Sequence, residues 1–279
     1  MLLLLAALVA SQGTDTTIQV KSGSRLELSS IDGDITVQTW SRSAVRVEAT
    51  HDEDTRIDVD QGDRTLSVSA RSRYGPSEVT WRLTVPADMA LDLSSQSGTV
   101  RVAGTRGEVS VSTVEGDITV EGGAGFIALQ TVDGSVGLSG SNGRLKVSSV
   151  DGTIDIRRAT GDIKASAVDG AITLTDIESS EVDASSVDGA ITFAGAIRPG
   201  GHYELSSHDG DVTVVAAAIN ADVSVSTFSG GFESDFPVTI SGTQHRGQMH
   251  FTLGTGGARL EVESFDGKVT LRKGTGGKP

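Results

Sequence analysis

The chain has no cysteine, and aromatic residues make up only 4% of its 279 positions. The absence of cysteine excludes disulfide bonds, thiol catalysis and a lipid-modified cysteine anchor. Lys and Arg number 23 against 37 Asp and Glu, which gives a formal net charge of −14. Because so acidic a surface repels phosphate backbones and anionic lipid head groups, we expect no binding to nucleic acid. Cations, basic proteins and neutral glycans stay open as partners.

Long hydrophobic runs are missing except in the first ten residues, MLLLLAALVA. This run is too short to span a bilayer as a helix, but it matches the apolar core of a signal peptide, and the small residues Ser11 and Gly13 follow it. No Lys or Arg precedes the run, and a buried first strand is the alternative. We interpret residues 1–13 as a signal peptide of a bacterial protein. The mature chain is then periplasmic, at the cell surface or secreted, with no membrane span.

Glycine is abundant, with 35 residues, and it marks an internal repeat. The glycines of a recurring Val-Asp-Gly-like tripeptide are 18 residues apart from Gly98 to Gly170, and the next steps are 19, 21 and 20 residues. A fixed period of this kind is the signature of a repeat architecture. The clearest copies are Ile31-Asp32-Gly33, Val114-Glu115-Gly116, Val132-Asp133-Gly134, Val150-Asp151-Gly152, Val168-Asp169-Gly170, Val187-Asp188-Gly189, His208-Asp209-Gly210 and Phe265-Asp266-Gly267.

Apolar residues alternate with polar ones on both sides of each repeat glycine. Counted from the glycine, they occupy positions −7, −5, −2, +2 and +4, which around Gly152 are Leu145, Val147, Val150, Ile154 and Ile156. A period of two on either side of a glycine predicts two short strands, each with one face inward. The spacing that an amphipathic helix needs is missing.

One strand pair buries too little apolar surface to fold alone, whereas stacked copies share a continuous core. The sequence therefore predicts an all-β, single-domain β-solenoid, similar to a parallel β-helix, built from 18-residue two-strand coils and without helices in the mature chain. A meander of hairpins is the alternative, but its turns would alternate between two ends, and the identical turn in every copy favours the solenoid.

We expect the solenoid to span residues 14–273. Longer, polar connections mark residues 14–90 as irregular N-terminal coils. Residues 91–234 are expected to form regular coils of 18–21 residues, and residues 235–273 the C-terminal coils. Residues 274–279 are expected to be a flexible tail.

Several stretches of the repeat share one pattern: IDGDITV at residues 31–37, the later copies VEGDITV, VDGTIDI, VDGAITL and VDGAITF, and FDGKVTL at residues 265–271. With the step Leu83-Thr84-Val85-Pro86, this pattern resembles the putative-adhesin family, whose β-strand-repeat domains of unknown function occur in bacterial envelope proteins. The likeness spans nearly the whole chain. It implies a solenoid fold and a place outside the cytoplasm, and it supplies no catalytic residues.

The strongest candidate site is the acidic column directly before the repeat glycine, at position −1. Stacked coils would place these carboxylates roughly 5 Å apart, where like charges repel. Two interpretations stay open: each Asp caps its own turn by accepting backbone N–H groups, or divalent cations such as Ca²⁺ bind between coils. No other cofactor is indicated. The proposed cation ladder comprises Asp133, Asp151, Asp169, Asp188 and Asp209.

Serine and threonine fill position −3, as at Thr131 and Ser149, and their hydroxyl groups are expected to point inward and bond the backbone. The five histidines show no serine and acid placed beside them as a catalytic triad requires. His208 falls in the −2 column, where we expect a core substitution or a wet corner. His245 and His250 are five residues apart, which is too weak a pattern for a metal site.

These observations favour a non-catalytic envelope or secreted solenoid that acts as an adhesin or a scaffold. A glycan or an envelope protein is the partner class that this reading admits. Two alternatives remain: a polysaccharide-active β-helix enzyme, which would need carboxylates or Ca²⁺ with a base in one groove, and a filament formed by end-to-end strand pairing.

Overall fold

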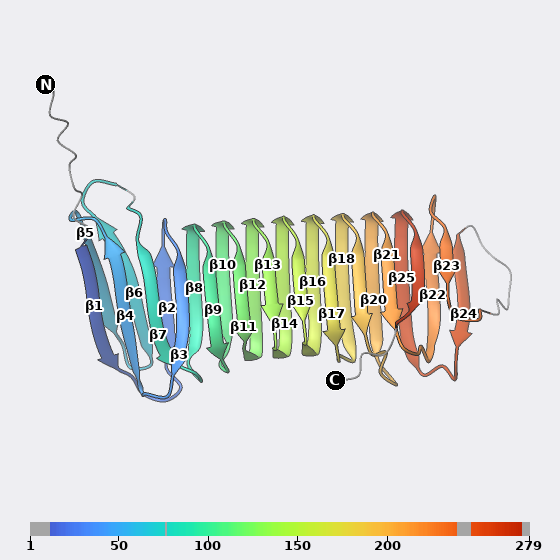
Figure 1. Ribbon diagram of the computed structural model, residues 1–279, viewed down its shortest axis with the longest axis horizontal. Coiled ribbons are helices and arrows are strands. Elements are labelled where there is room, and N and C mark those ends of the chain that lie inside the picture. The colour runs from blue at the N-terminus through green and yellow to red at the C-terminus, as the bar shows by residue number, and fades with distance from the viewer. Residues whose placement is uncertain (1–11, 76, 239–246, 275–279) are drawn as a thin grey trace, which may run out of the picture.

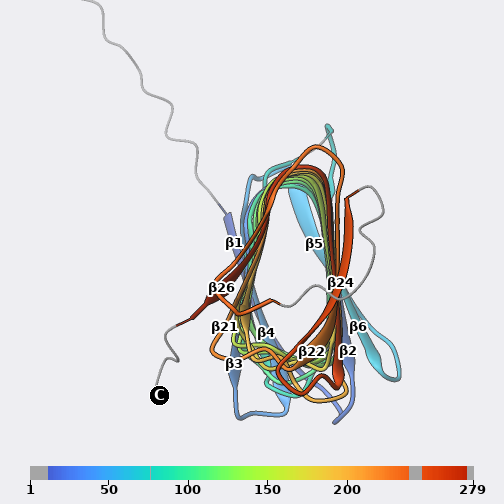
Figure 2. The ribbon, with the colours of Figure 1, turned by 90° about the vertical axis from the view of Figure 1, so that its right-hand side faces the viewer.

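The computed structural model describes residues 12–75, 77–238 and 247–274, and every regular element in these ranges is a β-strand. The strands form two sheets of thirteen strands each, which face one another along a straight rod (Figures 1 and 2). The all-β solenoid fold is therefore confirmed. Among the described residues, no helix is long and apolar enough to cross a membrane.

The first sheet contains, in spatial order, β1 (Gln12–Gln19), β4 (Ala44–His51), β7 (Thr80–Pro86), β3 (Ile35–Trp40), β9 (Val100–Thr105), β11 (Ile118–Gly122), β13 (Val136–Ser139), β15 (Ile154–Arg157), β17 (Ile172–Ile177), β19 (Ile191–Gly195), β21 (Val212–Ala216), β26 (Val269–Lys273) and β23 (Phe232–Ser234). The second contains β24 (Gln248–Leu253), β22 (Ala221–Thr227), β25 (Ala258–Asp266), β20 (His202–Asp209), β18 (Glu181–Asp188), β16 (Thr160–Asp169), β14 (Asn142–Asp151), β12 (Ala124–Asp133), β10 (Val109–Glu115), β8 (Ala90–Ser97), β2 (Arg25–Ser30), β6 (Thr65–Ser72) and β5 (Thr55–Gln61).

Each regular coil gives one strand to each sheet and stacks on the next coil in parallel. Strand β14 pairs with β16 so that Leu145 lies beside Ile163 and Asp151 beside Asp169. Strand β15 pairs with β17 in the same sense. Like residues of successive copies therefore lie side by side, which is the arrangement that the repeat predicted, and a meander of hairpins is excluded for these coils.

The core lies between the two sheets and consists of four of the five predicted apolar columns. Leu145, Val147, Ile154 and Ile156, at positions −7, −5, +2 and +4, are at most 1% exposed. The prediction for position −2 was wrong, because Val150 is 46% exposed. Side chains of a strand alternate between its faces, so the inward series −7, −5 continues at −3 and leaves −2 on the outside.

Two features of the turn require glycine at this position: the backbone angle φ and the close approach of the preceding coil. Gly152 has a φ of 147°, a region that residues with a side chain rarely adopt. A Cβ atom at this position would lie 2.1 Å from the carbonyl oxygen of Gly134 in the preceding coil. The amide of Gly152 donates to the carbonyl of Asp169 in the following coil at 2.9 Å, so the backbone ladder continues through the turn.

At both ends of the rod the strand order departs from the sequence order. The first complete coil, β2–β3, lies between β6–β7 and β8–β9. The last coil, β25–β26, lies between β20–β21 and β22–β23. Beyond them, β1, β4, β5 and β24 pair in antiparallel fashion. Parallel stacking in sequence order was expected throughout, and the structure corrects this at the two ends.

The core next to the C-terminal coil holds a buried tyrosine whose hydroxyl group both donates and accepts a hydrogen bond. Tyr203 on β20 is 0% exposed, donates its hydroxyl to the carbonyl of Ser179 at 2.6 Å and accepts from the amide of Arg198 at 2.9 Å. Burial raises the pKa of Tyr203 above its ordinary value. Its ring meets Phe193 edge to face at 5.6 Å between centroids.

The glycine column supplies the first prediction. Gly152→Ala should lower the free energy of unfolding by about 3 kcal/mol or more, because the new Cβ meets the backbone and the φ angle is unfavourable. Gly140 is the matched control, since it has a φ of 67° but a Cβ there would meet nothing within 4 Å. Gly140→Ala should cost only about 1 kcal/mol. Urea unfolding curves measure both, and equal losses would contradict the role assigned to coil stacking.

Candidate functional site

The exposed edge of the repeat turns forms a continuous row that we call the turn ridge. It consists of the residues at −2 and −1, which lie at the end of each strand of the second sheet. In-register pairing of β10 through β20 with β25 places each rung beside the next. The rungs are Val114-Glu115, Val132-Asp133, Val150-Asp151, Val168-Asp169, Val187-Asp188, His208-Asp209 and Phe265-Asp266.

The structure brings the predicted acidic column together in one line on the ridge. Asp133 pairs with Asp151, Asp151 with Asp169, Asp169 with Asp188, and Asp188 with Asp209, and all five are exposed. Within the described ranges, no three His, Cys, Asp or Glu side chains converge in a way that would hold a metal ion. A cation ladder along these residues stays a prediction.

The turns are capped by a different acid from the one that the sequence suggested. In the described part of the chain, none of the five Asp of the proposed ladder accepts a backbone N–H. The carboxylates that do so stand at position +1 and act between coils: Asp117 accepts the amide of Ser135 at 2.8 Å, and Asp211 that of Lys268 at 2.8 Å. Only some copies carry Asp at +1, which is why the repeat pattern did not point to it.

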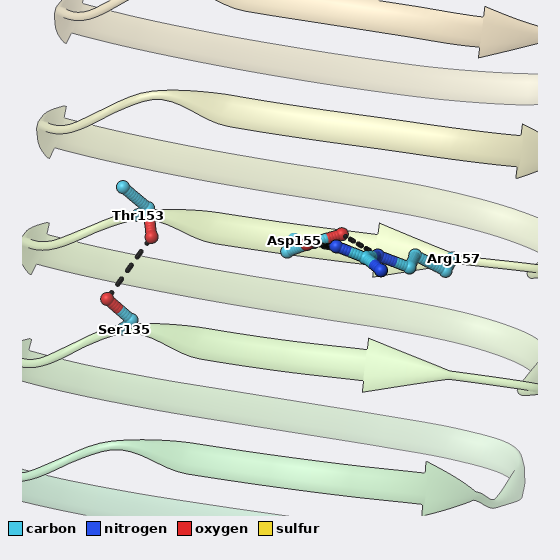
Figure 3. Close-up of polar contacts among 4 residues, drawn as sticks. All are labelled: Ser135, Thr153, Asp155 and Arg157. Carbon is cyan, nitrogen blue, oxygen red and sulfur yellow. Dashed lines mark hydrogen bonds and ion pairs between the residues drawn. The ribbon is translucent and has the colours of Figure 1, made fainter.

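In two neighbouring copies without Asp at +1, a pair of hydroxyl groups connects the coils instead. Thr153 donates its Oγ1 to Ser135 Oγ of the preceding coil at 3.1 Å (Figure 3). On the outer face of β15, which follows Thr153, Asp155 accepts from Nε of Arg157 at 2.8 Å, and both side chains point away from the core (Figure 3). Asp155 is thus charge-paired, whereas in the part of the chain that the structure describes no ridge carboxylate forms an ion pair.

The hydroxyl groups at position −3 close the core at this edge, as predicted. Ser149 and Ser207 are 3% and 2% exposed. Ser149 donates to the carbonyl of Gly134 at 3.0 Å, and Ser207 to that of Gly189 at 2.9 Å. Each hydroxyl thereby bonds the turn of the preceding coil. They are structural groups, buried and without an imidazole partner.

At the C-terminal end, the apolar row of the ridge changes from valine to aromatic residues. His208, Phe265 and Phe228 stack in that order, with centroid separations of 4.8 and 4.7 Å. Phe228, at position −2 of the β22 coil, is 76% exposed. His208 is also exposed on the outside of the rod, so of the two expectations for this position the core substitution was wrong and the wet corner is confirmed.

A second feature is a groove of about 860 Å³ on the outer face of the second sheet, near the C-terminal end. Its charged and polar lining comes from four strands: His202 on β20, Asp222 and Ser224 on β22, His250 on β24, and Arg259 and Glu261 on β25. Arg259 forms an ion pair with Glu261, and Asp222 accepts from Thr252 Oγ1 at 2.7 Å.

The groove was missed from the sequence because β25 lies between β20 and β22. Residues of these strands are neighbours only in the permuted order, and a fixed repeat spacing carries no sign of it. The side chains offer hydrogen-bond donors and acceptors of both charges, which suits a polar ligand. His51 bonds Thr14 Oγ1 at the other end of the rod, and His245 lies outside the described residues.

Comparison with known proteins gives one family. The family model of Toastrack DUF4097 matches residues 23–272, which is most of the chain. Among curated proteins, none matches. The family assignment therefore depends on that model.

Three solved structures resemble the chain at low identity. A putative adhesin from Parabacteroides merdae is 12% identical, with a TM-score of 0.46 over 93% of this chain and 96% of that one. A putative adhesin from Parabacteroides distasonis is 11% identical, with a TM-score of 0.39 over 94% and 98%. A putative cell adhesion protein from Clostridium sporogenes is 7% identical, with a TM-score of 0.25 over 94% and 99%.

The two acidic positions of the turn should differ in what they contribute to stability. Asp117→Ala removes the acceptor of an inter-coil hydrogen bond and should cost about 1 kcal/mol. Asp133→Ala removes a carboxylate without a backbone partner and should change the free energy of unfolding by less than about 0.5 kcal/mol. Urea unfolding of the two variants measures the difference. A larger loss in the free energy of unfolding for Asp133→Ala than for Asp117→Ala would show that the acid at position −1 caps the turn after all.

Proposed function

We propose that this chain, which belongs to the Toastrack DUF4097 family, is a non-catalytic, exported bacterial rod that binds an extended partner along its turn ridge, as an adhesin or scaffold. The observation that carries the proposal is the uninterrupted row of equivalent exposed rungs. Six of the seven rungs offer one apolar side chain and one carboxylate at the coil pitch, and the remaining rung is His208-Asp209. A repetitive partner would meet many equal subsites, so that weak single contacts add to a strong total.

The exposed apolar half of each rung supports a binding role. Val132, Val150, Val168 and Val187 are between 46% and 51% exposed and lie on adjacent coils. Contiguous apolar patches on a soluble protein typically mark interaction sites.

The charge of the ridge restricts the partner. From Gly116 to Gly210, no Lys or Arg occupies any position from four residues before to one residue after the repeat glycine. A polyanion would be repelled, whereas a neutral glycan or the basic segment of an envelope protein would not. Export is supported by the apolar run at the start of the chain.

The groove near the C-terminal end supports a second candidate function, a polysaccharide-active enzyme. His250, Arg259 and Glu261 line it together, and acid–base chemistry on sugars uses carboxylates with a base of this kind. Hydrolysis or elimination of polysaccharides by the chain, lost in Glu261→Gln, would favour the enzyme over the binding rod.

The binding proposal is tested by a screen of neutral glycans and purified envelope proteins on the mature chain, with and without Ca²⁺. The ridge variant Asp133→Asn, Asp151→Asn, Asp169→Asn should weaken the observed binding roughly tenfold, since three exposed charge contacts contribute about 0.5 kcal/mol each. The control variant Glu121→Gln, Asp162→Asn, Glu204→Gln carries the same change in net charge away from the ridge. It should bind as the unaltered chain does.

Three outcomes decide between the alternatives. Equal weakening by both variants would show a general charge effect and contradict binding at the ridge. Binding that requires Ca²⁺ and is lost only in the ridge variant would establish a cation ladder that includes Asp133, Asp151 and Asp169. Binding that is unchanged by Ca²⁺ would remove the ladder from the account.

A further inference from the structure

The valines of the turn ridge are flanked by a different row on each side. At the tip of the turn, position −1 carries a carboxylate in each coil, and we call these residues the acid row. Position −4 lies two residues before each valine and faces outward as the valine does, because side chains alternate along a strand. Six successive coils carry Ser or Gln at this position, and we call them the donor row: Ser112, Gln130, Ser148, Ser166, Ser185 and Ser206.

The strand register places each row in a straight line. The pairing of β10, β12, β14, β16, β18 and β20 brings every member of the donor row beside the next. The ends of these strands lie side by side along one edge of the rod (Figure 1). Across the ridge, the order in each coil is therefore donor, valine and acid.

The donor row is available to a partner outside the chain. A serine hydroxyl or a glutamine amide can each donate a hydrogen bond. Ser94, at position −4 of the preceding coil, donates to the carbonyl of Leu28 at 3.4 Å. In the part of the chain that the structure describes, the six side chains of the donor row make no such bond, and none of the six residues is buried. The ridge thus has free donors on one side of its valines and free carboxylates on the other.

This order of rows is self-complementary about a two-fold axis that runs along the rod. Such an axis keeps the direction of a second rod and exchanges the two sides of its ridge. Valine then meets valine, and the donor row of each copy meets the acid row of the other. A two-fold axis across the rod would place acid row against acid row, where like charges repel.

The spacing of the rungs also fits a second rod. Neighbouring coils are about 4.8 Å apart. An α-helix, with turns of about 5.4 Å, and an extended strand, with like-facing side chains about 6.7 Å apart, fall out of step with this spacing. A polyproline helix repeats every 9.3 Å or so and meets only every second rung. A second copy of the chain has the same spacing at every rung.

We propose that the turn ridge pairs with the turn ridge of a second copy, side by side and in parallel. The inference rests on the proposed binding role of the ridge and names a partner for it. The net charge of −14 on each copy opposes their approach, but physiological salt screens charges that are more than about 8 Å apart. The complementary rows, in contrast, meet at contact distance.

The strip of contact is narrow, which determines how strong the pairing is. From Val114 to Val187 it is about 19 Å long, too short for the 800 Å² or so that each partner buries in a stable interface. Single copies in solution therefore pair weakly. Rods that are held close together in one orientation pair strongly, because their effective concentration is high.

Disulfide trapping in this cysteine-free chain tests the pairing. Val114→Cys and Val187→Cys place one thiol each on rungs that are four coils apart, and Glu121→Cys places one on an exposed position of β11 in the other sheet. Under mild oxidation, each ridge variant should form disulfide-linked dimers roughly tenfold faster than the Glu121 variant, because pairing raises the local thiol concentration. Equal rates for the ridge and control variants would overturn the proposal.

A mixture of the two ridge variants, one of them carrying an affinity tag, tests the orientation. In the parallel pair, residue 114 meets residue 114 of the other copy and lies about 19 Å from residue 187, which is beyond the range of a disulfide. Only dimers of one variant with itself should form. Dimers that join position 114 to position 187 would contradict the parallel arrangement.

Charge placed on the donor row provides the matched comparison. In the Val187→Cys chain, Ser148→Asp, Ser166→Asp and Ser185→Asp set carboxylates against the acid row and should slow the cross-linking roughly fivefold or more. Thr119→Asp, Thr173→Asp and Thr192→Asp add the same charge on the outer face of the first sheet and should leave its rate unchanged. Equal slowing by both sets would show a general charge effect and contradict the pairing of the rows.

One further variant separates this proposal from the binding role of the ridge. Asp133→Asn, Asp151→Asn and Asp169→Asn keep an acceptor oxygen in the acid row, so the cross-linking at position 187 should persist. The same variant should bind a glycan or an envelope protein more weakly. Weaker binding of such a partner without any ridge cross-linking would overturn the pairing of copies alone, and the absence of both effects would overturn the binding role as well.

Discussion

The structure depends on the direct contact between the backbones of successive turns. The amide of each turn glycine from Gly98 to Gly189 donates to a carbonyl of the next coil, as from Gly152 to Asp169, and no side-chain atom fits between these turns. This contact fixes the register of both sheets, because a slip by one residue would turn every core side chain outward. The turn thus needs glycine for its contact with the backbone of the preceding turn as much as for its φ angle.

The ridge is a by-product of that register. Once like residues are forced into rows, every outward valine becomes part of an apolar line and every aspartate part of an acidic one. Rows of like charge are unfavourable for folding, but exposure to water keeps the repulsion small. The acidic row is therefore tolerated by the fold without being required by it, which is the reason for assigning it to partner binding.

Much of the central rod could be predicted from one sequence. The 18-residue spacing, the alternation around Gly152 and the hydroxyl groups at position −3 were sufficient for the solenoid and for the inward face of each strand. Val150 was misassigned because an apolar residue was taken as a core residue, although its parity with Val147 placed it on the opposite face. The capping role of Asp117 was missed because it acts between coils and recurs in only some of them.

The ends of the rod could not be predicted, since their pairing is not local. Residues 258–273 return along the rod and lie beside β20–β21, so their spatial order differs from their sequence order. The same is true of β2–β3, which lies between β6–β7 and β8–β9. The gap between Gly230 and Gly267 gave the distance along the sequence to the next copy, but it did not indicate where that copy lies in the rod. The groove of His202, Asp222 and Glu261 is a consequence of this return, so it became visible only in the structure.

The in-register contact between neighbouring turns is tested most directly by paired cysteines in this cysteine-free chain. Asp151 and Asp169 are partners on adjacent coils, whereas Asp151 and Asp188 are two coils apart. Adjacent strands are about 4.8 Å apart, within the Cα range of a disulfide, and two coils span about 9.6 Å, which is beyond it. Under mild oxidation, the variant with Cys at 151 and 169 should form an intramolecular disulfide and remain folded, and the variant with Cys at 151 and 188 should not. A disulfide between 151 and 188, or none between 151 and 169, would contradict the stacked register.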